Sequence, residues 1–172
     1  MTTFPDFAAH SASQKDFGYY RQTFTLHPKQ MADLKLPVSL KWERTKFDKK
    51  NLDQVLAKPG VYAFVISCDD PGLPPHGYVL YIGQTKGKKK PRTLRIRMKE
   101  YFKEEERPKR PRVYEMLNKW KGFLFFYFAP VDPAAASLLD VEAKLNDAMI
   151  PPYSQQDFSA DIRKKKNILE AT

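Results

Sequence analysis

The sequence predicts an α+β domain built on a small antiparallel β-sheet of about three core strands flanked by helices, in the order β-β-α-α-β-α. Two short apolar runs separated by a proline-rich loop are typical of an antiparallel pair of strands. The charged segment after them has apolar residues at helical spacing. A third apolar run is then followed by a long amphipathic segment, which indicates another strand and a final helix.

The composition supports one packed domain with a basic surface. The chain has 172 residues, of which 42% are hydrophobic and 29% are charged. Thirty Lys and Arg residues against twenty Asp and Glu residues give a formal net charge of +10. This balance indicates a polyanionic partner, either a nucleic acid or an anionic membrane surface. The single cysteine, Cys68, excludes an internal disulfide and a multi-cysteine zinc site, and the three histidines form no ligand-spaced pair.

Targeting signals and membrane segments are not visible in the sequence. No stretch approaches the ~18 consecutive apolar residues that a membrane span requires. Residues 1–10 contain no basic segment followed by an apolar run, as a secretory signal would. A basic amphipathic helix with bulky apolar residues, typical of membrane-surface proteins, is also missing. We therefore expect a cytoplasmic protein that does not bind membranes.

Residues 1–57 are expected to form an N-terminal extension of unknown role. Residues 1–35 show no sustained periodicity, although their aromatic residues argue against a fully solvated tail. The segment Leu36–Trp42 is a candidate short strand. Asn51–Lys58 is expected to be a short helix whose first residue is the N-cap and which Pro59 ends.

The first two strands of the main domain follow directly. Gly60–Ser67 is rich in β-branched and aromatic residues and is apolar on both faces, which indicates a central strand. Residues 68–76 contain three prolines and a glycine and are expected to form a loop. Gly77–Gly83 is expected to return antiparallel to the first strand.

Two helices are predicted next. Residues 86–92 form a basic loop with five positive charges. Thr93–Lys103 is expected to be a helix because apolar side chains recur at every fourth position. Val113–Lys119 is expected to be a second, short helix.

The last strand and helix complete the domain. Gly122–Ala129 includes six consecutive apolar residues and should lie inside the sheet. Asp132 followed by proline is a helix-start signal, and the helix should run to about Met149. We therefore assign residues 58–156 to the main domain and residues 157–172 to a basic C-terminal tail.

The last helix carries a carboxylate within its apolar stripe. Leu138, Leu145 and Met149 define the stripe, and Glu142 lies inside it instead of opposite it. An unpaired buried carboxylate would cost several kcal/mol, so it requires a cation partner, a metal or a pocket that admits water. The alternative is that the helix is rolled slightly, which would place Glu142 at the edge of the stripe in a surface ion pair.

Arg97 and Tyr101 share one face of the first long helix. A planar guanidinium beside a phenol suits a phosphodiester, because it can bind two phosphate oxygens at once. The alternative for Arg97 is an ordinary solvated side chain. Tyr62 and Tyr81 each lie on a predicted core strand beside a glycine, where the alternative is a packed aromatic with a satisfied hydroxyl.

These residues also form an ordered set along the chain: Gly60-Val61-Tyr62, Tyr81-Ile82-Gly83, Leu94 with Arg97, Tyr101, and the helical Glu142. In type, order and approximate spacing, the set resembles the GIY-YIG nuclease superfamily. The resemblance covers roughly residues 58–156. It implies a metal-dependent endonuclease that hydrolyses phosphodiester bonds in DNA.

The resemblance also implies a role for each residue. Tyr62 and Tyr81 would surround the attacking water, and one of them would act as, or within, the general base. Arg97 would bind the scissile phosphate, and Tyr101 would help to position the water or the phosphate. Glu142 would hold a single Mg²⁺ or Mn²⁺ ion, which would account for a carboxylate that faces inward.

At two positions the residue differs from the one that some members of the superfamily carry. Ser154 stands where many members carry Asn, and its shorter side chain is expected to position metal or phosphate less well. Gln84 stands where some repair-type members carry Lys, although other members also have Gln. If Ser154 impairs the site, the chain is instead a DNA-binding module on the same fold with little or no cleavage.

The basic loop lies next to the proposed site. Its positive residues are Lys86, Lys88, Lys89, Lys90 and Arg92. Contacts from them to the DNA backbone would give affinity that does not depend on sequence, and the alternative is a solvated loop. One metal site cuts one strand, so double-strand cleavage would require a homodimer or two encounters.

Overall fold

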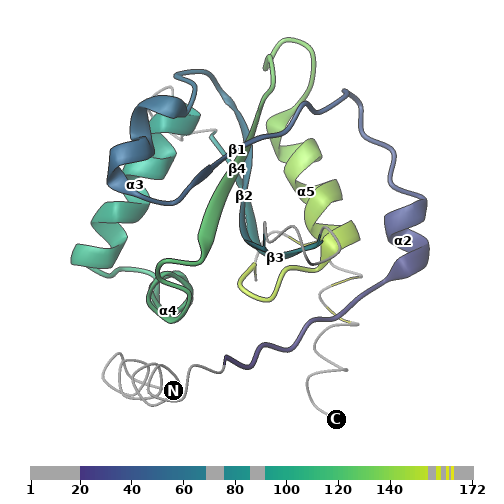
Figure 1. Ribbon diagram of the computed structural model, residues 1–172. Coiled ribbons are helices and arrows are strands. Elements are labelled where there is room, and N and C mark those ends of the chain that lie inside the picture. Colours follow the sequence, from purple (N-terminus) through teal and green to yellow (C-terminus); the bar gives the residue numbers. More distant parts are fainter. Residues whose placement is uncertain are drawn as a thin grey trace.

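The computed structural model describes residues 20–68, 76–85, 92–154, 158, 159, 162 and 164. Helices cover both faces of a single sheet, so the fold is α+β, as predicted (Figure 1). The elements in chain order are helix α2 (Pro28–Ala32), strand β1 (Glu43–Lys46), 3₁₀ helix η1 (Lys49–Gln54), strands β2 (Gly60–Cys68) and β3 (His76–Gln84), helices α3 (Leu94–Glu106) and α4 (Pro111–Lys119), strand β4 (Leu124–Pro130) and helix α5 (Leu138–Met149).

The sheet has four antiparallel strands in the order β1-β4-β2-β3. β2 is an inner strand with a neighbour on each side, which accounts for its apolar residues on both faces. β3 is an edge strand. The predicted count of about three strands and the predicted element order are therefore corrected: β2, β3, α3, α4, β4 and α5 follow one another as expected, but α2, β1 and η1 precede them.

The additional strand comes from the segment expected to be an extension. β1 pairs with β4, with Thr45 opposite Phe126. The predicted strand Leu36–Trp42 is wrong, because this segment is irregular. Its residues Leu36, Val38 and Leu40 pack against the apolar cluster that includes α5 instead of joining the sheet.

The predicted helix Asn51–Lys58 is instead the 3₁₀ helix η1, which ends at Gln54. It begins before Asn51, because Asp48 caps it by accepting a hydrogen bond from the amide of Lys50.

The boundaries of three helices also differ from expectation. Helix α4 begins at Pro111, before the predicted start at Val113. Ser137, not Asp132, is the N-cap of α5, and its hydroxyl accepts a hydrogen bond from the amide of Asp140 at 3.4 Å. Asp132 instead accepts a hydrogen bond from Ala134 and closes a turn before the helix. Helix α3 continues to Glu106, beyond the predicted end.

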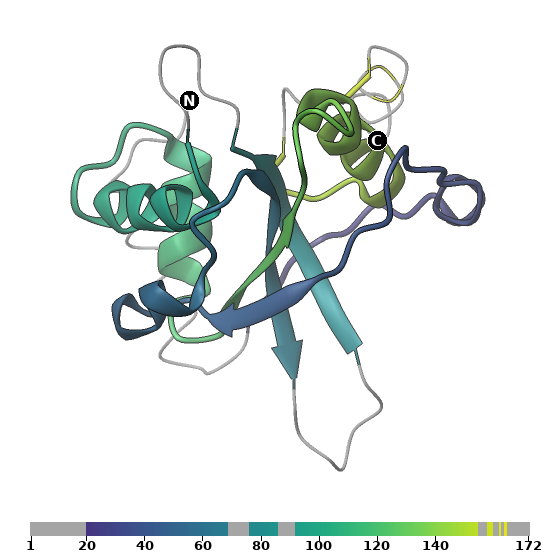
Figure 2. The same ribbon diagram turned by 90° about the horizontal axis from the view of Figure 1, so that it is seen from above.

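The sheet separates two apolar layers (Figure 2). Alternate residues of β2 point to opposite faces, as the pleat requires. Tyr62 and Phe64 pack in the layer under α3 and α4, whereas Val61 and Ala63 pack in the layer under α5. Residues of β2 that face α3 therefore lie in a different layer from Val141 and Leu145 of α5.

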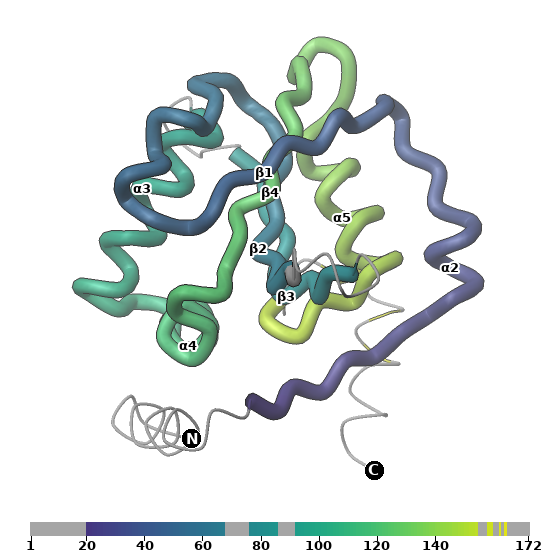
Figure 3. The backbone as a smooth tube through the Cα atoms, in the orientation of Figure 1, coloured from purple at the N-terminus to yellow at the C-terminus, as the bar shows by residue number. Residues whose placement is uncertain are grey.

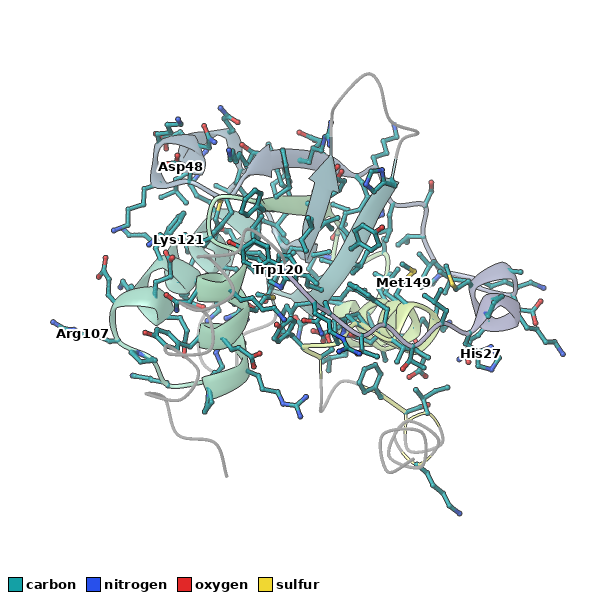
Figure 4. All side chains as sticks on the ribbon, turned by 60° about the horizontal axis from the view of Figure 1, so that its bottom comes forward. His27, Asp48, Arg107, Trp120, Lys121 and Met149 are labelled. Atoms are coloured by element: carbon teal, nitrogen blue, oxygen red, sulfur yellow. The ribbon has the colours of Figure 1, made fainter. Side chains whose placement is uncertain are left out.

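The segment before α2 docks on the main domain. The ring of Tyr20 lies 5.2 Å from that of Trp120, which Figure 4 labels. The Nζ atom of Lys119 donates hydrogen bonds to the carbonyl of Arg21 at 2.5 Å and to Oε1 of Gln22 at 3.2 Å. Burial lowers the pKa of Lys119. Figure 3 traces this segment from the α4 side towards α2. In the part of the chain that the structure describes, no helix has the length and apolarity needed to cross a membrane.

Candidate active site

Tyr62 lies at the centre of the α3-facing side of the sheet. Its side chain is fully buried, and its cross-strand partner on β3 is Gly83. A Cβ atom added to Gly83 would overlap the hydroxyl and ring of Tyr62. The glycine of the second motif therefore has a packing role: it leaves room for the tyrosine of the first.

The glycine of the first motif has a similar explanation. A Cβ atom on Gly60 would overlap the carbonyl oxygen of Ala129 on the neighbouring strand β4. The amide of Gly60 donates to the hydroxyl of Thr85 at 3.0 Å, just after β3. The start of β2 is thus held between its two neighbours, which fixes the position of Tyr62 two residues later.

Arg97 approaches Tyr62 from the first turn of α3. Thr93 caps this helix by accepting a hydrogen bond from the amide of Ile96. The Nε and Nη2 atoms of Arg97 donate to the Tyr62 hydroxyl at 3.1 and 2.7 Å, and Nη1 donates to Glu100 at 2.5 Å. Only 13% of the Arg97 side chain is exposed. The guanidinium is therefore held along one edge by a phenol and at the opposite corner by a carboxylate.

Tyr101 completes the hydrogen-bond network. Its hydroxyl lies 2.9 Å from that of Tyr62. The Tyr62 oxygen already accepts two N–H groups from Arg97, which occupy its acceptor capacity, so the proton of Tyr62 is directed to Tyr101. The guanidinium carbons of Arg97 and Arg110 lie 5.5 and 4.9 Å from the centre of the Tyr101 ring, within the range of cation–π interactions.

Tyr81 borders this network from β3. Its ring centroid lies 6.4 Å from that of Tyr62 and 6.2 Å from that of Tyr101. Tyr81 is half-buried, whereas the other two tyrosines are fully buried. The structure therefore brings Tyr62, Tyr81, Arg97 and Tyr101 together on one face of the sheet, and we refer to these four residues as the tyrosine–arginine cluster.

The environment of the cluster sets its protonation. Burial raises the pKa of Tyr62 well above its ordinary value; the neighbouring Tyr101 adds to this effect and Arg97 opposes it. Burial alone lowers the pKa of Arg97, but Tyr62, Tyr101 and Glu100 outweigh it, so the pKa of Arg97 is raised. At neutral pH, Tyr62 is therefore a neutral phenol and Arg97 a cation.

Glu100 is a member of the site that the sequence analysis missed. Its carboxylate contacts Arg97 and also lies 3.2 Å from Nε of Arg92. The three-residue spacing of Arg97 and Glu100 on one helix was the available signal. Of the five predicted DNA-binding residues, Lys86, Lys88, Lys89 and Lys90 lie outside the described residues.

Glu142 lies on α5, the helix whose apolar residues pack in the other layer. It lies on the buried side of α5 with 9% of its surface exposed, next to Val141, which packs against the sheet. Its position within the apolar stripe agrees with the periodicity. Helix α5 and the helix that carries Arg97 cover opposite faces of the sheet (Figure 2).

Asn146, one turn after Glu142, is a second residue that the sequence analysis missed. Its side chain is fully buried; Nδ2 donates to the carbonyl of Glu142 at 3.1 Å, and Oδ1 has no hydrogen-bond partner within the described structure. Four-residue spacing places both side chains on one helix face. A carboxylate and an unsatisfied amide oxygen are the ligand types that Mg²⁺ prefers, so these residues fit a divalent cation.

This cation would have few protein ligands. The described residues contain no group of three or more His, Cys, Asp or Glu side chains suited to a metal. Mg²⁺ needs no such group, because it is commonly bound through one or two carboxylates together with waters and substrate phosphates. The residues present therefore match a site that is completed by the substrate.

Ser154 and Gln84 lie along the edge strand. The Ser154 side chain is fully buried, and its hydroxyl accepts a hydrogen bond from the amide of Ile82 at 3.3 Å. The amide of Tyr153 donates to the carbonyl of Leu80 at 3.0 Å, so the segment after α5 covers the outer edge of β3. Gln84 is half-buried at the end of β3.

Comparisons with known proteins assign no function to the chain. No family model, curated protein or solved structure matches the chain. The residues of the tyrosine–arginine cluster, together with Glu142 and Asn146, are therefore the basis for assigning a function.

Proposed function

We propose that this chain is a GIY-YIG-type endonuclease that hydrolyses phosphodiester bonds in DNA with the help of one Mg²⁺ or Mn²⁺ ion. The observation that carries the proposal is the guanidinium of Arg97, held by the hydroxyl of Tyr62 beside two further tyrosines. A charged, oriented guanidinium in an aromatic setting is suited to an anionic substrate. The net charge of +10 favours DNA as that substrate.

Arg97 binds the scissile phosphate in this proposal. Arg97 stays protonated because its pKa is raised. Tyr62 fixes the plane of the guanidinium before the substrate binds. A donor oriented in advance stabilises the additional negative charge of the transition state without reorganisation. Arginine also offers two parallel N–H groups to two phosphate oxygens, which lysine does not.

Tyr62 and Tyr81 have different roles. The raised pKa of Tyr62 and its two hydrogen bonds from Arg97 support a positioning role and argue against a phenolate that removes a proton from water. Tyr81 is half-buried and therefore closer to solvent. We assign to Tyr81, with Tyr101 beside it, the orientation of the attacking water.

Glu142 and Asn146 would hold the divalent cation. When bound, a divalent cation neutralises phosphate charge and stabilises the leaving oxygen. The contribution of the chain is a buried carboxylate and an amide oxygen on adjacent turns of α5. The two residues lie on α5 and Arg97 lies on α3, so substitutions on separate helices can test metal binding and phosphate binding.

Nicking of supercoiled plasmid tests the proposal. We expect wild-type protein to produce nicked circles in Mn²⁺ and none in EDTA, and Arg97→Ala to produce none in either. Intact plasmid after incubation with folded wild-type protein in Mn²⁺ would reject the hydrolase.

The second candidate is a DNA-binding module that does not cleave. The hydroxyl of Ser154 is used by the backbone of β3, so this position supplies no amide to a metal or phosphate. This module would bind duplex DNA in EDTA, measured by fluorescence anisotropy, and would leave plasmid intact in Mn²⁺. Cleavage in Mn²⁺ that Arg97→Ala abolishes would exclude it.

A further inference from the structure

Glu100 lies where two arginines converge. Its Oε2 atom accepts a hydrogen bond from Nη1 of Arg97 at 2.5 Å, and its Oε1 atom lies 3.2 Å from Nε of Arg92. The exposed fractions of the three side chains are 30% for Glu100, 42% for Arg92 and 13% for Arg97. Arg92 is therefore the most exposed of the three side chains. Arg97 is the most buried of them and contacts Tyr62 in the core.

We propose that Arg92 and Arg97 form a binding site for a DNA backbone phosphate, and that Glu100 occupies this site in the DNA-free protein. The inference rests on the proposed function, because it takes Arg97 to be a phosphate ligand. A carboxylate and a phosphate bind guanidinium groups through the same pattern of N–H···O contacts. Glu100 thus holds the place of the phosphate, and DNA displaces it.

The hydrogen bonds of Arg97 favour this role over a positioning role for Glu100. Tyr62 already fixes the guanidinium through Nε and Nη2. Glu100 accepts a hydrogen bond from Nη1 of Arg97, the group directed away from Tyr62. If Glu100 turned outward, Nη1 and Arg92 would both become available to a phosphate while Tyr62 still held Arg97 in place.

Displacement costs little on the exposed side of the site. The pair between Arg92 and Glu100 is partly solvated on both partners, and exposed ion pairs contribute little to stability. A phosphate that replaces the carboxylate retains the contacts to both arginines and adds the attraction of a chain with a net charge of +10. The exchange is therefore expected to occur on DNA binding without a change of fold.

The sign of the effect of Glu100→Gln distinguishes the two roles. If Glu100 competes with DNA, removing its charge strengthens DNA binding; if it positions Arg97, removing it weakens DNA binding. Glu106→Gln is the matched control, because Glu106 lies on the same helix, is exposed and pairs with Lys49 at 2.8 Å. Both changes alter the net charge equally.

The experiment measures the Kd of a short DNA duplex by fluorescence anisotropy in EDTA over a range of salt concentrations. We expect Glu100→Gln to bind about threefold more tightly than Glu106→Gln, a gain of the size expected from release of one exposed ion pair. The slope of log K against log salt should stay close to that of the control, because the phosphate contacts the same two arginines in both complexes. Arg92→Ala should remove the gain, and Glu100→Ala should reproduce it.

Equal affinity of the two glutamine variants, weaker binding by Glu100→Gln than by wild type, or no DNA binding by any variant would overturn the inference. Nicking in Mn²⁺ is measured on the same proteins. Tighter binding by Glu100→Gln without nicking by any protein would reject hydrolysis and retain the phosphate site. Nicking by wild type with no difference between Glu100→Gln and Glu106→Gln would reject the site and retain hydrolysis.

Discussion

The hydroxyl of Tyr62 accepts two hydrogen bonds from the guanidinium of Arg97, from Nε at 3.1 Å and from Nη2 at 2.7 Å. The two residues come from a central strand and from the helix that covers it, and Tyr62 is fully buried. The orientation of the arginine is therefore fixed by the core of the protein and not by surface contacts. Such preorganisation is what a site for developing negative charge requires.

Tyr62→Phe should leave the ring in place but remove the acceptor for Arg97. Loss of a buried hydrogen-bond partner is expected to lower the unfolding free energy by about 1–3 kcal/mol. Because Arg97 would then lack the hydroxyl that orients it, single-turnover cleavage should fall by about a hundredfold, the size expected from a small misplacement of a catalytic group. Unchanged cleavage by a variant whose melting temperature has fallen would show that Arg97 keeps its orientation without Tyr62.

The raised pKa of Tyr62 predicts a pH dependence of stability. In the unfolded chain this tyrosine ionises near its ordinary pKa of 10.0, whereas the folded protein keeps it protonated to higher pH. The folded state then binds more protons, so the stability that this group contributes is complete below the unfolded pKa and is lost as pH rises above it. Urea unfolding at pH 8 to 11 should show a steeper loss for wild type than for Tyr62→Phe. Parallel curves would contradict the assignment.

Gly83→Ala should disturb the same network from the opposite strand. The added Cβ would overlap the hydroxyl and ring of Tyr62, which is fully buried. Overpacking of this kind costs about 1–3 kcal/mol, and displacement of Tyr62 should also reduce cleavage. Gly77→Ala is the control on the same strand, where the nearest atom is a side-chain carbon of Val65 at 3.2 Å that can shift slightly. Equal effects of both changes on the melting temperature would show that Tyr62 does not confine Gly83.

The elements that are predictable from the sequence are those whose own apolar residues mark them, either as a continuous run or at helical spacing. The runs that became β2 and β4 carry this pattern, and so does the helix that begins after Thr93. β1 lacks it: Thr45 is its only buried residue, and its strand conformation depends on pairing with β4. An element that is specified by its partner cannot be recognised from its own residues.

The same distinction applies to the site. The tyrosines and Arg97 were found because they stand in an ordered set of motifs. Glu100 and Asn146 were missed because helical spacing alone does not tell which side chain is buried or which amide oxygen lacks a donor. These properties depend on the packing of the helix against the rest of the fold.

Arg97→Lys should fold but cleave poorly. Lysine carries the charge but has no planar group that can contact Tyr62 twice and Glu100 once. We expect cleavage to fall by about a hundredfold or more, as for loss of an oriented transition-state donor, and Arg97→Ala to abolish it. Circular dichroism of both variants provides the control for folding. Wild-type rates with either variant would remove Arg97 from the site.

Glu142→Gln tests the metal assignment most directly. If Glu142 holds the cation, Mn²⁺ should raise the melting temperature of wild type, and the rise should vanish in the variant. A ligand that binds only the folded state contributes about 2.7 kcal/mol at about 100 times its Kd, which is readily measured. Asn146→Leu should weaken the Mn²⁺ effect while keeping the volume of the buried side chain, because it removes only the polar atoms.

Melting in EDTA separates a metal site from a structural ion pair. If the cation is the main electrostatic partner of Glu142, Gln keeps the shape of the side chain and removes a buried charge, so stability in EDTA should change little or increase. If Glu142 instead belongs to a buried ion pair, the same change strands its partner and should destabilise the protein by about 3–5 kcal/mol. Large destabilisation in EDTA with cleavage retained would place the metal elsewhere. Loss of both the Mn²⁺ effect and cleavage, with unchanged stability in EDTA, would support Glu142 as the metal ligand.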